Sequence, residues 1–392
     1  MKNFTIALIL MFSFSVFANA QERRLSRADS LKIYRGGEFY PVQNYPVKFS
    51  KNKRPKNVIF LIGDGMGLAQ LYAGMTANGG RLFIDNFKNI GFSKTYSADN
   101  YVTDSAAGGT ALASGTRTNN DYLGVDTDKD AIVNIRELAE KMGKTTGVVS
   151  TSAVTHATPG SFVAHQPGRS MYEEIANDFV NSDIDVFIGG GLDHFTKRKD
   201  KRDLTNDLKN NGFQVLTDIN KIANVTSGKL AGLTAPEHNG RASERGNMLP
   251  IATNTAINIL KNNKKGFFLM VEGSHIDWGG HDNDVNYIVE EVLDFDRTIA
   301  VALEFAARNR ETLIVITADH ETGGLALNGG NLETGMVRAA FTTGGHTGIL
   351  VPIYAFGPGA EYFRGFMHNI DIPKLIISLL KQPIRYKLKL KY

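Results

Sequence analysis

One serine stands where nucleophilic chemistry needs it, directly before a run of small residues. Residues 102–112 read VTDSAAGGTAL, which places Ser105 in the first turn of a predicted helix, with Thr103 or Asp104 as the N-cap. Unpaired backbone N–H groups and the positive end of the helix dipole favour negative charge there and attract an anion. The small residues 106–109 would let a bulky anion approach the backbone closely. Taken alone, the stretch also fits a capping serine before a tightly packed helix.

Carboxylates and imidazoles follow the ends of four predicted strands. Ligands of open α/β sheets gather beyond the carboxyl ends of the strands, so we expect these side chains to converge. Asp277 and His281 are four residues apart, which puts both on one face of a helical turn. His346 lies in a glycine-rich loop that lets its ring reach inward. The residues at the strand ends are Asp64, His156 with Thr158, Glu272, and Asp319 with His320.

Each of these residues also has a plain structural role. Asp64 can stabilise a glycine turn, Glu272 can be a surface acid, and the two later histidines, His281 and His346, can be hydrogen-bonded in the core or a loop. These structural roles cannot explain all of the residues at once, because unpaired carboxylates buried at one sheet edge repel one another strongly without cations. The set therefore predicts metal ions beside Ser105, as a serine phosphotransferase needs.

The elements that must position these residues alternate between strand and helix. Continuous apolar runs predict buried parallel strands at 58–62, 146–150, 267–271 and 313–317, and two further strands are predicted at 184–188 and 350–356. Helices are predicted at 68–77, 132–141, 250–261 and 285–308. This alternation predicts an α/β fold, a three-layer sandwich with a mainly parallel central sheet and helices on both faces.

One catalytic domain over residues 21–392 is expected, because the chain has no internal repeat and no Pro- or Ser-rich linker. Within it, residues 193–248 are the expected insertion, since they are charged, Asn-rich and poor in apolar periodicity. Residues 21–55 are expected to wrap the surface. The alternating basic tail, residues 385–392, is expected to form an edge strand, because lysines commonly blunt exposed edges.

The composition disfavours nucleic-acid binding and metal binding through cysteine, and the first residues predict where the protein is located. Residues 1–20 combine Lys2, an apolar run and an A-x-A site, which predicts a signal peptide and a location in the periplasm or outside the cell. No later stretch is long enough to span a membrane. The formal net charge of +4 over 392 residues is too small to argue for nucleic-acid binding. With no cysteine, the chain must hold any metal with His, Asp, Glu and hydroxyl groups.

The glycine turn after the first strand offers a rival interpretation. Gly63, Gly65 and Gly67 follow a strand as in a dinucleotide-binding fingerprint. However, the sixth position of that motif is Leu68, and Asp64 would face a pyrophosphate unfavourably unless a metal intervened. The mismatch disfavours a dinucleotide site.

Six motifs, in order, resemble those of the metal-dependent alkaline phosphatases over nearly all of the chain after residue 20. They are FLIGDGMG at 60–67, TDSAA at 103–107, HATP at 156–159, EGSHID at 272–277, TADHE at 317–321 and GHTG at 345–348. The resemblance implies an alkaline-phosphatase-like fold, hydrolysis of small phosphate monoesters with broad tolerance, and a homodimer as the assembly usual in the family.

The resemblance further implies two Zn²⁺ ions and one Mg²⁺ ion. The implied ligand sets are Asp277, His281 and His346 for one zinc; Asp64, Asp319 and His320, with Ser105 beside them, for the other; and Asp64, Thr158 and Glu272 for magnesium. Nitrogen and carboxylate donors suit zinc, and the all-oxygen set suits magnesium. Arg169 falls where the family places a phosphate-clamping arginine. The implied reaction is two in-line displacements through a phosphoserine on Ser105.

Two positions depart from the best-known bacterial members of the family, which carry Asp and Lys there. His156 and Trp278 would lie around the magnesium and the phosphate, so the identity of the third metal stays open, and Trp278 also fits a packing role. Of the other histidines, three are expected at the surface (His194, His238 and His368) and two beside the site or in structural roles (His165 and His275).

Two other classes of function stay open beside the phosphomonoesterase. A phosphodiesterase or sulfatase would share the fold, but the chain has no cysteine for formylglycine, and Arg169 suits a dianionic terminal phosphate. A non-catalytic metal- or phosphate-binding protein is disfavoured, because the nucleophile and every implied ligand are intact.

Overall fold

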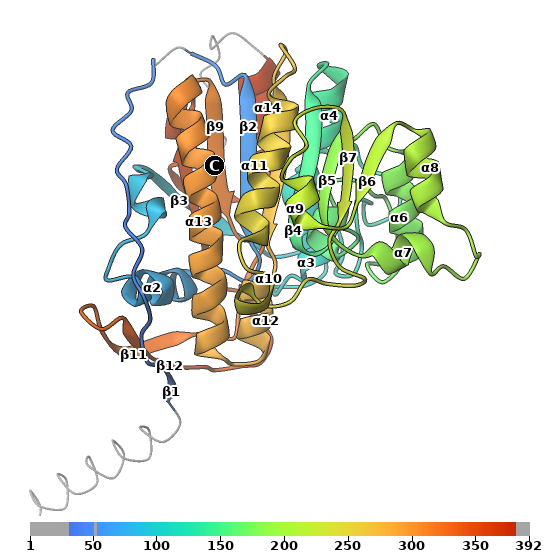
Figure 1. Ribbon diagram of the computed structural model, residues 1–392. Coiled ribbons are helices and arrows are strands. Elements are labelled where there is room, and N and C mark those ends of the chain that lie inside the picture. The colour runs from blue at the N-terminus through green and yellow to red at the C-terminus, as the bar shows by residue number, and fades with distance from the viewer. Residues whose placement is uncertain (1–30, 51–52, 382–392) are drawn as a thin grey trace, which may run out of the picture.

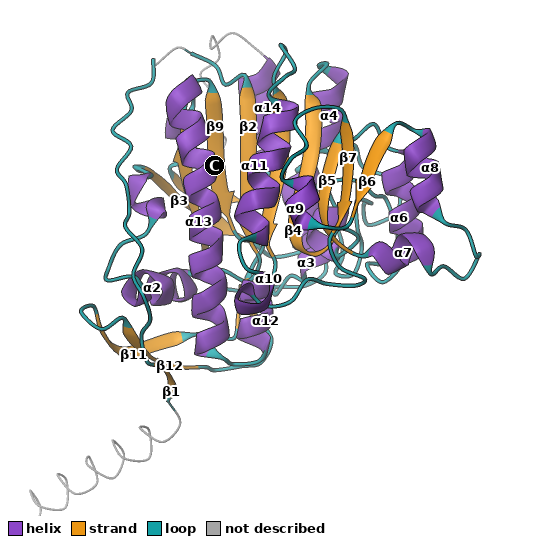
Figure 2. Ribbon diagram, in the orientation of Figure 1, coloured by secondary structure: helices purple, strands orange, loops and turns teal. Residues whose placement is uncertain are grey.

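The structure is a computed structural model that describes residues 31–50 and 53–381. In this part of the chain, a central sheet of ten strands separates two layers of helices (Figures 1 and 2), which confirms the predicted α/β sandwich. Only β14 runs antiparallel to its neighbours among these strands. Across the sheet, the order is β15 (Gly365–His368), β3 (Asn89–Lys94), β14 (Val351–Phe356), β9 (Thr312–Thr317), β2 (Asn57–Gly63), β8 (Phe267–Gly273), β4 (Thr145–Ala153), β5 (Val186–Gly190), β7 (Lys229–Leu233) and β6 (Phe213–Leu216).

The two helical layers bury separate apolar clusters against the sheet. One cluster is covered by α2 (Leu68–Ala77), α9 (Ile219–Ile222), α11 (Met248–Leu260) and α13 (Val285–Asn309). The other is covered by α3 (Ser105–Ser114), α4 (Ile135–Lys141), α6 (Tyr172–Asn181), α7 (Leu192–Thr196), α8 (Leu204–Asn210) and α14 (Asp371–Lys381). Shorter helices complete the loops: α5 (Ala157–Gly160), α10 (Ala242–Arg245), α12 (His275–His281) and the 3₁₀ turns η1 (Phe83–Asn86) and η2 (Ala360–Phe363).

The predicted elements are present, with shifted ends. Every residue of β2, β8 and β9 is buried, as their continuous apolar runs predict for strands covered on both faces. The helix predicted from residue 132 begins instead at Ile135. Asn134 caps it, because its side chain accepts from the Glu137 N–H while the Glu137 carboxylate accepts from the Asn134 N–H.

The segment expected as an insertion, residues 193–248, supplies part of the central sheet. Its two strands, β7 and β6, continue the sheet beyond β5 as parallel neighbours. Both are short, and β6 is only partly buried, so neither gave a clear apolar run in the sequence.

The N-terminal residues 31–50 run along the outside of the molecule beside α13, as expected of a surface wrap (Figure 1). They begin in β1 (Lys32–Tyr34), which pairs with β12 (Met336–Ala340) in a small sheet that also contains β11 (Ala326–Asn331). A further pair joins β10 (Glu321–Thr322) to β13 (His346–Thr347). The expected signal peptide and basic tail lie outside the described residues. None of the described helices combines the length and apolar character of a membrane span.

Candidate active site and metal centres

Ser105 begins α3, and Asp104 caps that helix as one of the two predicted alternatives. The Asp104 Oδ1 accepts from the Ala107 N–H at 2.9 Å, and Ser105 itself is buried. The neighbouring glycines allow close packing: a Cβ at Gly108 would lie 3.1 Å from the Asp319 side chain, and one at Gly109 would lie 2.9 Å from Ser161 Oγ. The small-residue run therefore brings α3 against the turn after β9 and against α5, a packing role beside the anion approach that we expected.

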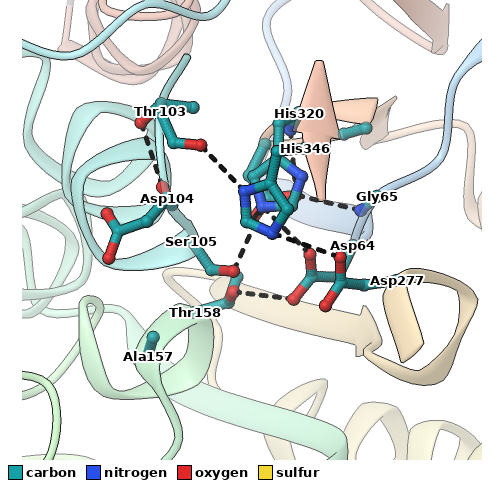
Figure 3. A network of polar contacts seen from close by, with 12 residues as sticks. Asp64, Gly65, Thr103, Asp104, Ser105, Ala157, Thr158, Asp277, His320 and His346 are labelled. Carbon is teal, nitrogen blue, oxygen red and sulfur yellow. Dashed lines mark hydrogen bonds and ion pairs between the residues drawn. The ribbon is translucent and has the colours of Figure 1, made fainter. Parts of the chain in front are cut away.

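The predicted strand-end residues meet at one edge of the sheet, where Figure 3 shows Asp64, Thr158 and His320 around Ser105. Ile62 of β2 pairs with Glu272 of β8 on one side and with Thr317 of β9 on the other. This register brings Asp64, just past β2, level with Glu272 and with the turn that carries Asp319. All three carboxylates are fully buried. Parallel pairing of three apolar strands is therefore what collects these acids in one place.

One group of possible metal ligands contains Asp277, His281 and His346, whose ligand atoms lie within 4.8 Å of one another. The Nδ1 atoms of the two histidines lie 2.7 Å from the Gly344 carbonyl and 2.9 Å from the Thr103 carbonyl. Because a carbonyl only accepts, each Nδ1 carries the proton in the neutral ring, and each Nε2 can then present a lone pair to a cation. Those two Nε2 atoms are 3.1 Å apart, an arrangement that suits a shared cation.

A second group surrounds the Ser105 hydroxyl. The Nε2 atom of His320 lies 3.1 Å from Ser105 Oγ, 3.2 Å from Asp319 Oδ2 and 3.5 Å from Asp64 Oδ1. Asp277 also lies within 4.8 Å of Asp64 and His320, so this carboxylate stands between the two groups.

A third group contains Asp64, Glu272 and His156, with Thr158 Oγ1 at 3.5 Å from Asp64 Oδ2. Three serines hold the Glu272 carboxylate: the hydroxyls of Ser150 and Ser274 donate to its Oε2 at 2.6 Å, and Ser152 donates at 3.5 Å. The serines are a set that the sequence analysis did not identify.

The electrostatics of the edge require positive charge. Burial, followed by the negative charges of Asp319 and Asp277, raises the pKa of Asp64 well above its usual value. Burial and the charges of Asp277 and Glu272 raise the pKa of Asp319 to about 7. One oxygen each of Asp64, Glu272 and Asp319 has no hydrogen-bond partner among the described residues. Unpaired buried carboxylate oxygens with imidazole and hydroxyl neighbours fit divalent cations.

The pKa values of Asp277 and of the histidines around it are shifted as well. Burial raises the pKa of Asp277, but the hydrogen bond from His281 and the charges of His320 and His346 outweigh it and bring the pKa below its usual range. The hydrogen bond to Asp277 raises the pKa of His281 to about 9. Burial and the charge of His346 lower the pKa of His320 well below its usual value, which favours the neutral imidazole, the form that binds a metal.

Arg169 lies beside the nucleophile, although its local sequence alone is that of a surface residue. Its Nη1 donates to Asp104 Oδ2 at 3.0 Å, and its Nη2 lies 3.4 Å from His156 Nε2. Asp104 thus both caps α3 and holds the guanidinium, a second role that the sequence analysis missed. The side chain of Arg169 keeps 25% of its surface exposed, which leaves donors available to an anion in front of Ser105.

Two expected surface histidines are not at the surface. His194 is buried: its Nδ1 lies 2.6 Å from Thr155 Oγ1, its Nε2 lies 2.9 Å from Glu237, and Tyr172 stacks on its ring. His238 is half-buried against His156 and Trp278. Both expectations are wrong because contacts distant in sequence cover these rings.

The remaining three histidines contact neighbouring side chains or the backbone, and one of them, His368, was also expected at the surface. His368 is half-buried beside Arg117. His165 contacts the Gly124 carbonyl and Glu137, a structural role. His275 stacks on Trp278 with 3.9 Å between the ring centroids, a packing contact, and the Trp278 ring also meets that of His156, so both of its expected roles stay open.

Comparison of the chain and its fold with known proteins identifies a family and several relatives. The model of the family described as "Alkaline phosphatase" matches residues 55–340. The chain is 33% identical to alkaline phosphatase 4 of Bacillus subtilis (strain 168), over 95% of this chain and 99% of that protein. It is 32% identical to streptomycin-6-phosphate phosphatase of Streptomyces griseus, over 81% of this chain and 88% of that one. The solved alkaline phosphatase of the Antarctic bacterium TAB5 superposes with a TM-score of 0.79 at 43% identity, covering 84% of this chain and 98% of that one.

Proposed function

The chain belongs to the alkaline phosphatase family and is a phosphomonoesterase, and from that premise we propose that it acts through a phosphoserine on Ser105. The observation that carries the proposal is the position of the hydroxyl. Ser105 Oγ lies at the N-terminus of α3 and 3.1 Å from His320 Nε2, beside two buried carboxylates with unpartnered oxygens. A nucleophile placed there lies at the positive end of the helix dipole and beside a group of ligand side chains that needs positive charge.

The proposed ions follow the three groups of side chains. One Zn²⁺ is assigned to Asp277, His281 and His346, a second to Asp64, Asp319 and His320, and Mg²⁺ to Asp64, Thr158 and Glu272. When bound, such ions lower the pKa of the serine hydroxyl and stabilise charge on the entering and leaving oxygens. His156 adds a nitrogen donor to the third group, so the choice of Mg²⁺ there rests on the three oxygen donors.

The chain's own residues carry the two displacements. Ser105 Oγ gives its proton to solvent water and forms a bond to phosphorus while the bond between phosphorus and the organic oxygen breaks, and that oxygen takes up a proton from solvent water. Water then attacks the phosphoserine from the opposite side, and Ser105 regains its proton as inorganic phosphate leaves. Arg169, held by Asp104, donates hydrogen bonds to the non-reacting phosphate oxygens in both steps.

The substrate is proposed to be a phosphate monoester recognised mainly through its phosphate, with broad tolerance for the organic group. One relative is named for a particular ester of this class, streptomycin 6-phosphate. Export to the periplasm or beyond the cell and assembly as a homodimer complete the proposal, on the pattern of residues 1–20 and on the family resemblance.

Hydrolysis of three p-nitrophenyl esters by the purified full-length protein tests this function. We expect the phosphate monoester to exceed both bis(p-nitrophenyl) phosphate and p-nitrophenyl sulfate by at least about 10²-fold in kcat/KM. Chelation should remove the activity and Zn²⁺ with Mg²⁺ should restore it, with metal analysis giving two zinc ions and one magnesium. Preference for the diester or the sulfate, or full activity after chelation, would overturn the proposal.

A further inference from the structure

The loop of residues 234–239, between β7 and α10, reaches the third ligand group from a part of the chain that carries none of its ligands. It places the ring of His238 with its centroid 5.4 Å from that of His156 and 4.8 Å from that of Trp278. Both contacts are nearly perpendicular, at 90° and 82°. This is the edge-to-face geometry that aromatic rings prefer.

Hydrogen bonds fix this loop on the end of β4. The Ala153 N–H donates to His238 Nδ1 at 3.0 Å, so Nδ1 is unprotonated and the ring has a single neutral tautomer, with the proton on Nε2. The Asn239 side chain donates to the Thr151 carbonyl at 3.1 Å. A Cβ at Gly190 would lie 2.0 Å from the Glu237 carbonyl oxygen, so only glycine lets β5 pass so close to the loop. His238 therefore stands on a rigid support.

The His156 ring, which His238 contacts, has few other contacts that could orient it. His156 Nδ1 is buried and has no hydrogen-bond partner among the described residues, while its Nε2 makes only the 3.4 Å contact to Arg169. The ring of His156 is thus oriented by its contacts with His238 and Trp278. Trp278 is itself fixed by stacking on His275, whose Nδ1 lies 3.0 Å from the Tyr287 hydroxyl.

We propose that His238 is a positioning residue for the cation site formed by Asp64, Glu272 and His156, and that it acts by holding the His156 ring. His238 belongs to none of the ligand groups found among the described residues, so its effect passes through that contact. The inference rests on the third cation of the proposed function. Residues that orient a ligand in this way typically change metal affinity by 10- to 100-fold.

Two substitutions separate the ring contact from the support of the loop. His238→Asn keeps an acceptor for the Ala153 N–H but removes the ring, whereas His238→Phe keeps a ring against His156 but removes the acceptor. The chelated full-length proteins are titrated with Co²⁺ alone, with bound metal measured by equilibrium dialysis and coordination followed by the visible Co²⁺ absorption. His368→Ala is the matched control, because it removes a half-buried histidine beside Arg117.

The wild type, His238→Phe and His368→Ala should bind a third Co²⁺ with similar affinity. His238→Asn should bind two equivalents normally and the third about 10- to 100-fold more weakly, with an altered absorption band. Wild-type third-site affinity and spectrum in His238→Asn overturn the inference. Equal weakening in Asn and Phe also overturns it, because the loop support alone would then explain the effect. If the wild type binds only two equivalents, the three-ion assignment of the proposed function fails instead.

Discussion

Two of the buried groups of charged side chains in the described residues balance their charge in different ways. At the carboxyl edge of the sheet, Asp64, Glu272 and Asp319 form no salt bridge to lysine or arginine among the described residues. Between α10 and α13, by contrast, Arg245 binds Glu291 through both terminal nitrogens, at 2.5 and 2.9 Å, and also contacts Asp294 at 2.7 Å.

The comparison shows how a functional cluster of charges differs from a structural one. The Arg245 group carries its own cation and is nearly closed to solvent, so its hydrogen bonds belong to the fold. The three carboxylates of the carboxyl edge have no salt bridge to lysine or arginine among the described residues, and each leaves an oxygen unpartnered, so the edge needs ions from solution. In the Arg245 group the Asp294 Oδ1 atom is unpartnered too, but one guanidinium contacts both acids. The following substitutions and conditions test this difference, from the largest expected effect to the smallest.

Ser105→Ala should have the largest effect, and on activity alone. Loss of the nucleophile should lower kcat by about 10⁴-fold or more and abolish incorporation of labelled phosphate, while the unfolding free energy changes little. Ser114→Ala is the control, because that serine ends the same helix, where its hydroxyl donates to the Thr110 carbonyl at 2.7 Å and accepts from the Thr116 N–H at 3.1 Å. A labelled Ser105→Ala protein would refute the proposed nucleophile.

Arg245→Met should affect stability. It leaves two buried carboxylates without their partner, which should lower the free energy of unfolding by about 3–5 kcal/mol in urea titrations of the metal-loaded protein. Arg308→Met, which removes an exposed partner of Glu304, should cost less than about 0.5 kcal/mol. If both substitutions lower the free energy of unfolding by the same amount, the buried Arg245 group stabilises the fold no more than an exposed ion pair does.

Removal of the metals should give the protein an unusual pH dependence. Without ions, Asp319 has a folded-state pKa of about 7, above its ordinary value of 3.8. A raised carboxyl pKa stabilises the folded state at low pH, and this stabilisation is lost as pH rises from about 4 to 7. The chelated protein should therefore lose on the order of 2 kcal/mol more than the loaded protein between pH 5 and pH 8. The Arg245 group contributes equally to both forms, so parallel pH profiles in urea titrations would contradict the carboxylate excess.

Asp104→Asn tests a charge pair that the chain forms at the rim of the metal centre. Asparagine can still cap α3, but it no longer attracts the Arg169 guanidinium, so kcat/KM should fall by roughly 5- to 10-fold. Urea titration should show an unchanged unfolding free energy. Unchanged kinetics would mean that Arg169 is held without Asp104.

The elements of the core were predictable because each has a local signal. The apolar runs of β2, β8 and β9 predict buried strands, and the acids at their ends then follow from the geometry of a parallel sheet. Short strands such as β6 and β15 lack such a run, so the full width of the sheet appears only in the structure.

Contacts between distant segments were not predictable. His238 is more than 80 residues from His156 and follows no motif, so its place beside that ring depends on how the loop packs on β4. The sequence suggested Asp104 as a cap, but not that its second oxygen binds Arg169. Arg169 itself was located by family resemblance, since nothing in its neighbourhood distinguishes it from a surface arginine.

The pairing of β1 with β12 has a consequence for the order in which the molecule assembles. Residues 32–34 leave the ribosome early, yet their partners at 337–339 are made about 300 residues later. Residues 31–50 can therefore be anchored beside α13 through β1 only after β12 has been made. The pairing of β1 therefore follows the synthesis of β12, and a truncated chain that lacks β12 would leave β1 without its partner strand.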